Sequence, residues 1–325
     1  MFTFQTTPQL IIGLNSLHPL FRMVKENHFK KIAVIFHHDA LGHIPIQVRR
    51  IVKKISHRGV ECTLYPLKVW SDSVEIAKNT ELIISYGNRS VHDVAKQSNR
   101  MKAHNYCIET VAGHMSSLGT GVVWEEHQTA WLAIFPQVIF NSCQNVHCWN
   151  IEDYLYFLHD ISLALEAVFN VKEIDDFAVA CAFGGSLQII KLYAKMLYIK
   201  SKRKLKKMYQ LLAQADVLCK NAYNNTHLSL EVKRVAESVE HYRQFEVVTA
   251  YESLDMVNNL IRRHRTKIEN ILQHFNWELN SFIKSFNQMY KDFTNHPKRW
   301  ETCGDILGKK MIQIMGKNQE TRKLM

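Results

Sequence analysis

The first 150 residues alternate between short apolar runs and amphipathic stretches. Three of the apolar runs have the length and the polar flanks of strands: Ile32–Phe36, Val60–Leu64 and Leu82–Tyr86. Residues 43–58 place apolar side chains at helical spacing, and Val74–Lys78 is expected to form a short helix. This βαβα order implies a parallel sheet with crossover helices, in which ligands bind at the carboxyl ends of the strands.

The pattern changes after residue 150, where apolar positions recur three and four residues apart with hardly a turn residue between them. This spacing is typical of amphipathic helices. It runs through the segments 155–169, 189–199, 203–221, 229–240, 245–270 and 272–293. The sequence therefore predicts an α/β nucleotide-binding-like domain at residues 1–148 and an all-helical domain at 149–325, with a cleft between them.

Composition supports a folded protein with much helix. Hydrophobic residues make up 46% of the 325-residue chain and charged residues 22%, which excludes wholesale disorder. The chain has 12 glycines and 6 prolines, too few for an all-β protein with many turns.

Seven cysteines form an odd set without a CxxC pair, which is typical of reduced thiols. The opening MFTFQTTPQL lacks the pattern of a signal peptide, and no apolar run reaches about 18 residues. We expect a cytoplasmic protein with no membrane partner.

The net charge of +11 raises the question of a polyanionic partner. The excess is spread over both halves of the chain, with one dense basic run from Lys200 to Lys207. This run is either a solvated helical face or an anion-binding patch. No RNA-binding or zinc-finger pattern accompanies it, so the charge changes the picture little and nucleic acid is not the expected partner.

Candidate chemistry first appears after the segment Leu82–Tyr86. A tight turn leading into a helix presents backbone N–H groups and the positive helix end to a phosphate. The turn here reads GNRSVHDVAK (87–96) and resembles the GGGSxxDxAK loop of the superfamily of iron-containing alcohol dehydrogenases, glycerol dehydrogenases and dehydroquinate synthases. In that family the loop holds the pyrophosphate of a nicotinamide dinucleotide. The resemblance implies binding of NAD or NADP by Gly87, Asn88, Arg89, Ser90, Asp93 and Lys96.

Three further segments are similar to family motifs in the same order. The opening FTFQTTPQLIIGLNSLHPL resembles P-x-x-I-x-F-G-x-x-x-x-L, residues 108–117 (IETVAGHMSS) resemble the loop IPTTAGTGSE, and residues 135–141 (FPQVIFN) resemble the strand after it. The resemblance adds Thr110, Gly113 and Ser116 to the implied cofactor site. Asp39 is a candidate acceptor for the adenine ribose, or a plain helix N-cap.

Several residues depart from the family pattern. Asn88 and Arg89 replace two loop glycines, and a Cβ there obstructs approach to a pyrophosphate and opposes positive φ. Arg89 could instead offer its guanidinium to a phosphate. His114 and Met115 replace a small Thr and Gly, so Met115 adds bulk where the family leaves space. A working nucleotide site and a loop retained for folding both remain open.

In the family, an acidic residue and later histidines of the helical domain hold a divalent metal that polarises an alcohol or carbonyl oxygen. The first-helix motif D-x-x-x-H-x-x-E-A resembles residues 159–167. Aligned on its Glu-Ala end, the resemblance puts His159 at the acidic ligand and Leu163 at the histidine. The expected carboxylate moves to Asp160, about 100° around the helix.

His227 and His241 follow His159 at separations near those of the family's ligands. Three imidazoles are a chemically sensible site for zinc, and the resemblance also allows iron. The alternative is that these are ordinary surface or core histidines. His264 and His274 are a further candidate pair.

Two functions follow. The resemblance implies a divergent NAD(P)-dependent oxidoreductase acting on an alcohol, polyol or carbonyl substrate in the interdomain cleft, with a homodimer as a candidate assembly. The alternative is a non-catalytic descendant with degraded cofactor and metal sites that acts as a binding protein. The order of the motifs favours the first, whereas Asn88, Arg89, Met115 and Leu163 favour the second. No GxSxG, GxxxxGK[ST] or HExxH pattern indicates another chemistry.

Overall fold

The computed structural model describes residues 9–38, 42–67, 74–99, 103–118, 121–123, 129–131, 136–143, 157, 160–161, 164–165, 168, 176–196, 198–226, 259 and 261–294. Of these, residues 89–90, 121–123, 129–131, 223–226, 286 and 289–294 are described by their backbone alone. The predicted domain boundary at residue 148 lies outside the described residues and stays a prediction.

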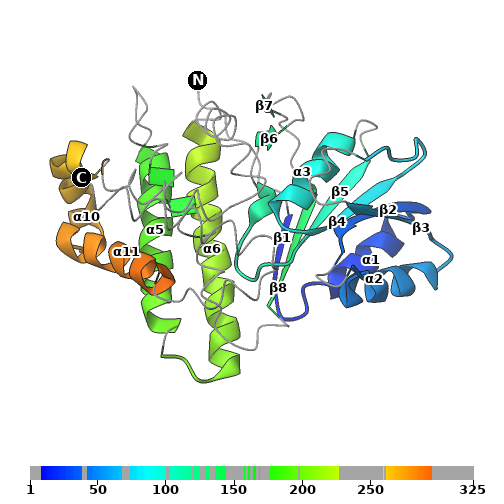
Figure 1. Ribbon diagram of the computed structural model, residues 1–325, viewed down its shortest axis with the longest axis horizontal. Coiled ribbons are helices and arrows are strands. Elements are labelled where there is room, and N and C mark those ends of the chain that lie inside the picture. The colour runs from blue at the N-terminus through cyan, green and yellow to red at the C-terminus, as the bar shows by residue number, and fades with distance from the viewer. Residues whose placement is uncertain are drawn as a thin grey trace.

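The N-terminal part of the chain builds a six-stranded parallel sheet in the order β1-β8-β5-β4-β2-β3 (Figure 1). Its strands are β1 (Gln9–Gly13), β2 (Lys31–His37), β3 (Glu61–Leu67), β4 (Leu82–Gly87), β5 (His104–Glu109) and β8 (Val138–Ser142). A separate antiparallel pair joins β6 (Gly121–Val123) to β7 (Thr129–Trp131). The parallel sheet confirms the predicted α/β class for this part of the chain.

Helices cover both faces of the sheet. Alternate side chains of a strand point to opposite faces, and β2 sends Val34 and Phe36 to one side and Ala33 and Ile35 to the other. The first face packs on α1 (His18–Glu26) and α2 (Ile46–Ser56), and the second on α3 (Arg89–Ser98). Burial on both faces explains why β2 and β4 read as continuous apolar runs.

The strand order places a topological switch point between β2 and β4. The chain leaves β2 toward β3 on one side and returns to β4 on the other side of β2. Crossover connections diverge there, which leaves room for a ligand outside the carboxyl ends of the two strands. His37 and Gly87 end those strands, and α3 begins directly after β4.

The helical part follows, to the left of the sheet in Figure 1. Helices α5 (Asp176–Met196) and α6 (Lys202–Thr226) are joined by a short turn and form the most extensive helix contact, while α10 (Arg265–His274) and α11 (Leu279–Thr294) follow later in the chain. Among the described helices, α5 alone is long and apolar enough by length and composition to cross a membrane, and 61% of that stretch is buried inside the structure. Such burial is what the central helix of a packed layer requires.

Two sequence predictions about elements are wrong. Val74–Lys78 is not a helix, because its backbone groups bond outside the segment: Val74 N donates to Ser98 Oγ at 2.9 Å and Ala77 N to Tyr65 Oη at 3.3 Å. The expected helical segments 245–270 and 272–293 meet near residue 271, whereas in the structure α10 continues to His274 and α11 begins at Leu279. The predicted helix at 229–240 lies outside the described residues.

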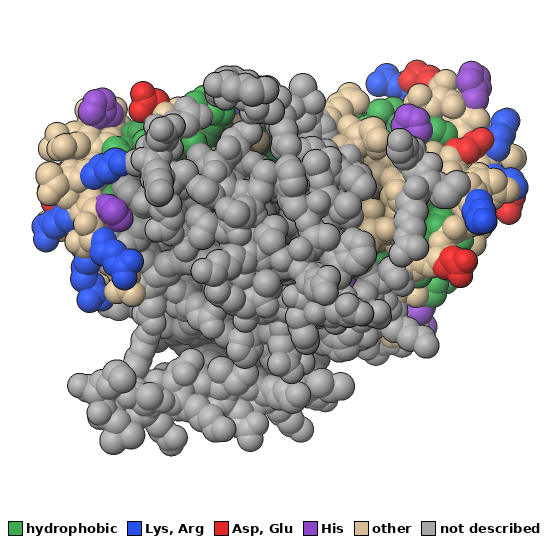
Figure 2. Space-filling view, turned by 90° about the horizontal axis from the view of Figure 1, so that it is seen from above, with side chains coloured by type: hydrophobic (Ala, Val, Ile, Leu, Met, Phe, Trp, Pro, Cys, Tyr) green, Lys and Arg blue, Asp and Glu red, His purple; other side chains and the backbone are tan. Residues whose placement is uncertain are grey.

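The surface seen from above carries both signs of charge (Figure 2). Over the α/β end of this view, described acidic, basic and histidine side chains lie interspersed. Basic side chains also stand at the helical end of the same view. On the described part of this face, the positive charge of the chain is therefore distributed rather than gathered over the sheet.

Candidate functional site

The loop between β4 and α3 lies at the switch point, and its backbone explains the residues found there. Asn88 has an extended backbone with φ of −99°, and Arg89 is already helical. Neither position needs a left-handed conformation, so the replacement of two family glycines by Asn88 and Arg89 causes no backbone strain. Gly87 is required by space, because a Cβ there would collide with the buried side chain of Val91.

Two other residues of the implied cofactor loop are buried on α3. Asp93 and Lys96 lie on α3, are 6% and 1% exposed, and form an ion pair of 3.4 Å between Lys96 Nζ and Asp93 Oδ1. Arg89 and Ser90 occupy the first turn of α3, which contains no acidic residue. The positive end of this helix is therefore not neutralised from within its own first turn.

The second implied segment joins the first at the edge of the sheet. Thr110 N donates to Gly87 O at 3.0 Å, which brings the end of β5 beside the end of β4. Gly113 has φ of +80°, and a Cβ there would meet Tyr209 O at 3.0 Å and Leu212 Cβ at 3.1 Å. Close approach to α6 and left-handed geometry together require glycine at position 113.

Ser116 opens a single 3₁₀ turn, η1 (Ser116–Leu118), and its side chain points inward to Glu109. Ser116 Oγ donates to Glu109 Oε2 at 2.6 Å, while Ser117 donates its N–H and its hydroxyl to Glu109 Oε1 at 2.7 and 2.6 Å. The family motif IPTTAGTGSE has Pro and Glu where this chain has Glu109 and Ser117. The carboxylate of this chain therefore lies at the second position of the motif, whereas the family has its carboxylate at the last position.

Glu109 also pairs with His92 of α3. His92 Nε2 lies 3.3 Å from Glu109 Oε2, and Ser85 Oγ lies 2.8 Å from His92 Nδ1. Burial alone would lower the pKa of His92, but Cys107 and Glu109 outweigh it and raise that pKa to about 10. Burial would raise the pKa of Glu109, but His92 and the serine donors lower it to about 2. The pair is therefore ionised at neutral pH in the interior of the domain.

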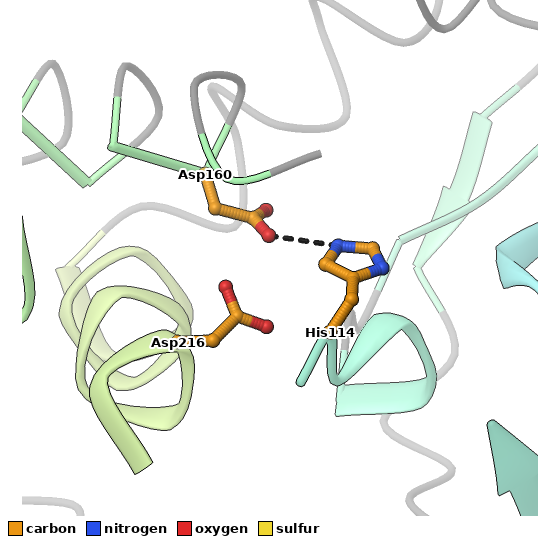
Figure 3. A group of neighbouring side chains, drawn as sticks. All are labelled: His114, Asp160 and Asp216. Carbon is orange, nitrogen blue, oxygen red and sulfur yellow. Dashed lines mark hydrogen bonds and ion pairs between the residues drawn. The ribbon is translucent and has the colours of Figure 1, made fainter. Parts of the chain in front are cut away.

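A second buried cluster joins the α/β part to the helical part (Figure 3). His114 precedes η1, Asp160 lies on a helical segment whose described residues fall within 157–168, and Asp216 lies on α6. Their side chains point toward one another, and one ligand atom from each lies within 4.8 Å of the others. His114 Nε2 is 2.9 Å from Asp160 Oδ2, and Met115 N donates to Asp216 Oδ2 at 2.7 Å. The loop of residues 113–118 is thus held by two helices.

Lys220, one turn after Asp216, completes this cluster. Its Nζ lies 2.6 Å from Asp160 Oδ2 and 3.8 Å from Asp216 Oδ2, with the lysine side chain 2% exposed. Burial opposes ionisation of Asp160, but Lys220 and His114 hold its pKa well below the ordinary value. Burial and the Asp160 carboxylate raise the pKa of Asp216, and burial with Lys220 lowers that of His114. Asp160, which lies nearest Lys220, is therefore more readily ionised than Asp216.

The donor set alone suits a metal, since an imidazole and two carboxylates are common ligands of zinc and iron. The arrangement does not. Oxygen ligands stand about 2.0–2.2 Å from zinc, and the ammonium of Lys220 already lies between the two carboxylates. A divalent ion therefore does not fit the cluster formed by His114, Asp160, Asp216 and Lys220.

Several predicted site residues are not placed. Asp39, His159, His227 and His241 lie outside the described residues, so the predicted three-histidine metal site stays a prediction. His264 and His274 are described, and they belong to no cluster of metal-type ligands in the described part of the chain. His274 Nδ1 instead lies 2.7 Å from Asn270 O of its own helix.

Sequence reasoning missed the residues that carry the buried charge: His92, Glu109, Asp216 and Lys220. A pattern was present for the last two, because an Asp and a Lys at i, i+4 interrupt the apolar face of the segment 211–222. No comparable pattern marks His92 and Glu109, which lie on different elements.

No protein-family model and no curated protein sequence matches this chain. Solved structures do. The sulfoacetaldehyde reductase of Bifidobacterium kashiwanohense, solved in complex with NAD⁺, has a TM-score of 0.69 at 11% identity, over 89% of this chain and 85% of that one. The maleylacetate reductase of Rhizobium sp. strain MTP-10005 has a TM-score of 0.66 at 14% identity, over 89% and 84%. An iron-containing alcohol dehydrogenase of Thermotoga maritima has a TM-score of 0.65 at 14% identity, over 88% and 87%.

These similarities confirm the expected fold, an α/β part followed by a helical part, across most of the chain. At 11 to 14% identity they show the architecture that the chain shares with these enzymes. Substrate and activity do not follow from them.

Proposed function

We propose that this chain is a divergent NAD(P)-dependent oxidoreductase acting on an alcohol, polyol or carbonyl substrate. One observation carries the proposal. The positive end of α3 opens directly after Gly87 at the switch point between β2 and β4, where doubly wound sheets bind their ligands. Thr110, from the second motif, is hydrogen-bonded to the same glycine.

The backbone of this loop supports binding of a pyrophosphate. Because Asn88 is extended and Arg89 helical, the N–H groups of the first turn can face an anion without a glycine at either position. Arg89 would add a guanidinium that pairs with phosphate oxygens. The proposal places the dinucleotide at the carboxyl edge of the sheet and the substrate between this edge and the helical part.

Hydride transfer to or from a carbon–oxygen bond also needs a group that stabilises charge on the oxygen. We propose zinc or iron on His159, His227 and His241 for this role; such a metal would polarise the substrate oxygen. Location in the cytoplasm belongs to the same proposal. The five described cysteines form no disulfide with one another, which supports it.

A non-catalytic binding protein is the second candidate, and one observation favours it. Met115 is fully buried, and the hydroxyls of Ser116 and Ser117 are turned onto Glu109. The side chains of this loop are therefore used to hold the fold together. A descendant that has lost catalysis would retain such contacts.

Calorimetric titration of the protein with NADH and NADPH separates the two candidates, with metal content measured on the same sample. The oxidoreductase predicts micromolar binding and stoichiometric zinc or iron. Arg89→Glu places an anion at the start of α3, which opposes a bound pyrophosphate, so we expect affinity to fall about tenfold or more. Helix stability should not suffer, because acidic residues are favourable in a first turn.

Lys78→Glu is the matched control. It makes the same change of charge at an exposed position before β4, at the opposite edge of the sheet. Equal loss of affinity in both variants would indicate a general charge effect. Absence of nucleotide binding and of metal in the wild type would reject the oxidoreductase in favour of the binding protein.

A further inference from the structure

The cluster of His114, Asp160 and Asp216 raises a separate question about which cation it holds. Three segments far apart in the sequence meet there: His114 and Asp160 are 46 residues apart, and Met115 and Asp216 are 101 apart. Asp160 and Asp216 are 1% and 0% exposed and His114 is 5% exposed. Two carboxylates in such a place require a cation, a proton or both.

The position of Lys220 answers the question geometrically. Its ammonium is within 4.0 Å of both carboxylates and is nearest Asp160 Oδ2, the same oxygen that His114 Nε2 faces at 2.9 Å. The lysine comes from the same face of α6 as Asp216, four residues later, so helix geometry alone brings its stem to the cluster. A divalent ion among these ligands would lie against an ammonium and be repelled by it.

We infer that Lys220 is the resident cation of the His114–Asp160–Asp216 cluster. Its ammonium excludes divalent metals from a site where the other three side chains would bind a metal ion. The cluster is then a metal-independent link between the loop of residues 113–118 and the helices. Loss of the lysine side chain converts the cluster into a site of one imidazole and two carboxylates. This inference is independent of nucleotide binding and of the histidines proposed as ligands above.

A carboxylate oxygen without a hydrogen-bond partner supports the expectation that the cluster binds a metal once the lysine side chain is removed. Asp216 Oδ1 is buried and has no hydrogen-bond partner among the described residues. Asp216 Oδ2 accepts from Met115 N, and Asp160 Oδ2 faces both Lys220 and His114. Removal of the ammonium therefore leaves an imidazole and two carboxylates whose ligand atoms lie within 4.8 Å of one another, and these are ligands that zinc and cobalt accept.

Cobalt(II) titration of metal-stripped protein tests the inference, because bound cobalt has visible absorption that reports its coordination. We expect Lys220→Ala to bind one equivalent more than the wild type, with Zn²⁺ displacing the cobalt. The double variant Lys220→Ala/His114→Ala should lose that equivalent. Lys220→Arg keeps the cation and should bind no more than the wild type.

Three outcomes would overturn the inference: a wild type whose cobalt is lost on His114→Ala alone, a Lys220→Ala variant that gains no equivalent, or a Lys220→Arg variant that gains one. Wild-type cobalt that persists in His114→Ala lies outside the cluster and agrees with the inference. The comparison of wild type with His114→Ala needs no lysine variant, so it decides the resident cation even if Lys220→Ala fails to fold.

The thermal unfolding midpoint provides a second readout. Added Zn²⁺ should raise the midpoint of Lys220→Ala, because a ligand that binds only the native state stabilises it. The double variant should show no such rise. A rise of equal size in the double variant would place the zinc elsewhere and count against the inference.

Discussion

Glu109 and His92 form an ion pair that is buried on both sides, with side chains 0% exposed. Glu109 accepts three hydrogen bonds from Ser116 and Ser117, and these donors together with His92 offset the cost of burying its charge. The hydroxyl of Ser85 donates to Cys107 Sγ at 3.2 Å, which leaves its oxygen to accept from the imidazolium of His92. The two ends of the family-like segment 108–117 are therefore held together by Glu109, at a position where the family motif has Pro.

The pair predicts a specific dependence of stability on pH. The pKa of His92 is raised from 6.5 to about 10, so its stabilisation is complete below about pH 6.5 and is lost as pH rises through 10. The pKa of Glu109 is lowered from 4.5 to about 2, so its stabilisation is present above 4.5 and is lost as pH falls through 2. The pair therefore contributes most between about pH 4.5 and 6.5. Denaturant unfolding should show His92→Gln destabilised by about 3–5 kcal/mol at about pH 5.5, with the difference from wild type shrinking as pH rises toward 10.

His57→Gln, at an exposed position just after α2, controls for the loss of an imidazole outside the pair. A His92→Gln difference that stays constant from about pH 5.5 to 9.5 would contradict the ionised pair.

At the scale of elements, helix ends and helix contacts explain where the chain departs from its periodicity. Helix α10 ends in a Schellman motif: Asn276 has φ of 51°, Trp277 N donates to Leu272 O at 3.0 Å, and Asn276 N donates to Gln273 O at 2.9 Å. Asn is one of the few residues that adopt this conformation readily, so the sequence contained a stop signal that hydrophobic spacing alone does not show.

Packing of α5 on α6 predicts opposite effects at two adjacent glycines. A Cβ at Gly185 would lie 2.7 Å from Cys219 Sγ and 2.8 Å from Ala215 O, so Gly185→Ala must push the helices apart and should cost about 1–3 kcal/mol. A Cβ at Gly184 meets nothing within 4 Å. Gly184→Ala should therefore stabilise by about 0.5–1 kcal/mol through lower chain entropy in the unfolded state.

Urea unfolding of both variants measures these changes. Cys219→Ala added to Gly185→Ala should rescue only part of the loss, since the carbonyl of Ala215 remains in the way. Full rescue, or equal effects of the two glycine substitutions, would show that the helices are not in close contact at this point.

At the scale of the whole molecule, the buried cluster makes the loop of residues 113–118 a joint between two parts of the chain. The loop is fixed from the sheet by Asn141, which accepts from Gly113 N at 3.1 Å and donates to His114 O at 2.8 Å. From the helices it is held by Asp160 and Asp216. The loop beside the proposed nucleotide site is therefore fixed both to the sheet and to two helices.

The two aspartates of this joint should differ in importance. Asp160→Asn leaves Lys220 buried without its charged partner at 2.6 Å and should cost about 3–5 kcal/mol. Burial and the Asp160 carboxylate raise the pKa of Asp216, which makes its charge less favourable than that of Asp160, and the amide oxygen of Asp216→Asn still accepts from Met115 N, so this substitution should cost about 1 kcal/mol or less. Guanidinium unfolding at neutral pH compares the two. Equal costs would mean that both carboxylates are ionised.

The sequence by itself determined the fold class and several of its elements. The apolar runs that begin at residues 32, 60 and 82 predicted β2, β3 and β4 to within a few residues. Apolar positions three and four residues apart predicted α2 and α6. Motif order predicted the fold now seen in reductases and dehydrogenases at 11 to 14% identity. These features were accessible because periodicity and turn chemistry are local properties of a chain.

Only the tertiary structure decided which charged side chains meet. Asp160 looked like a ligand displaced from its family position, yet folding turns it onto His114 and Lys220, 46 and 60 residues away. Asn88 and Arg89 replace two glycines of the family loop and left open whether the nucleotide site works, yet the backbone of an extended residue followed by the helix start needs no glycine there. Ion-pair partners and backbone angles depend on the register of strands and the approach of helices, which no local pattern specifies.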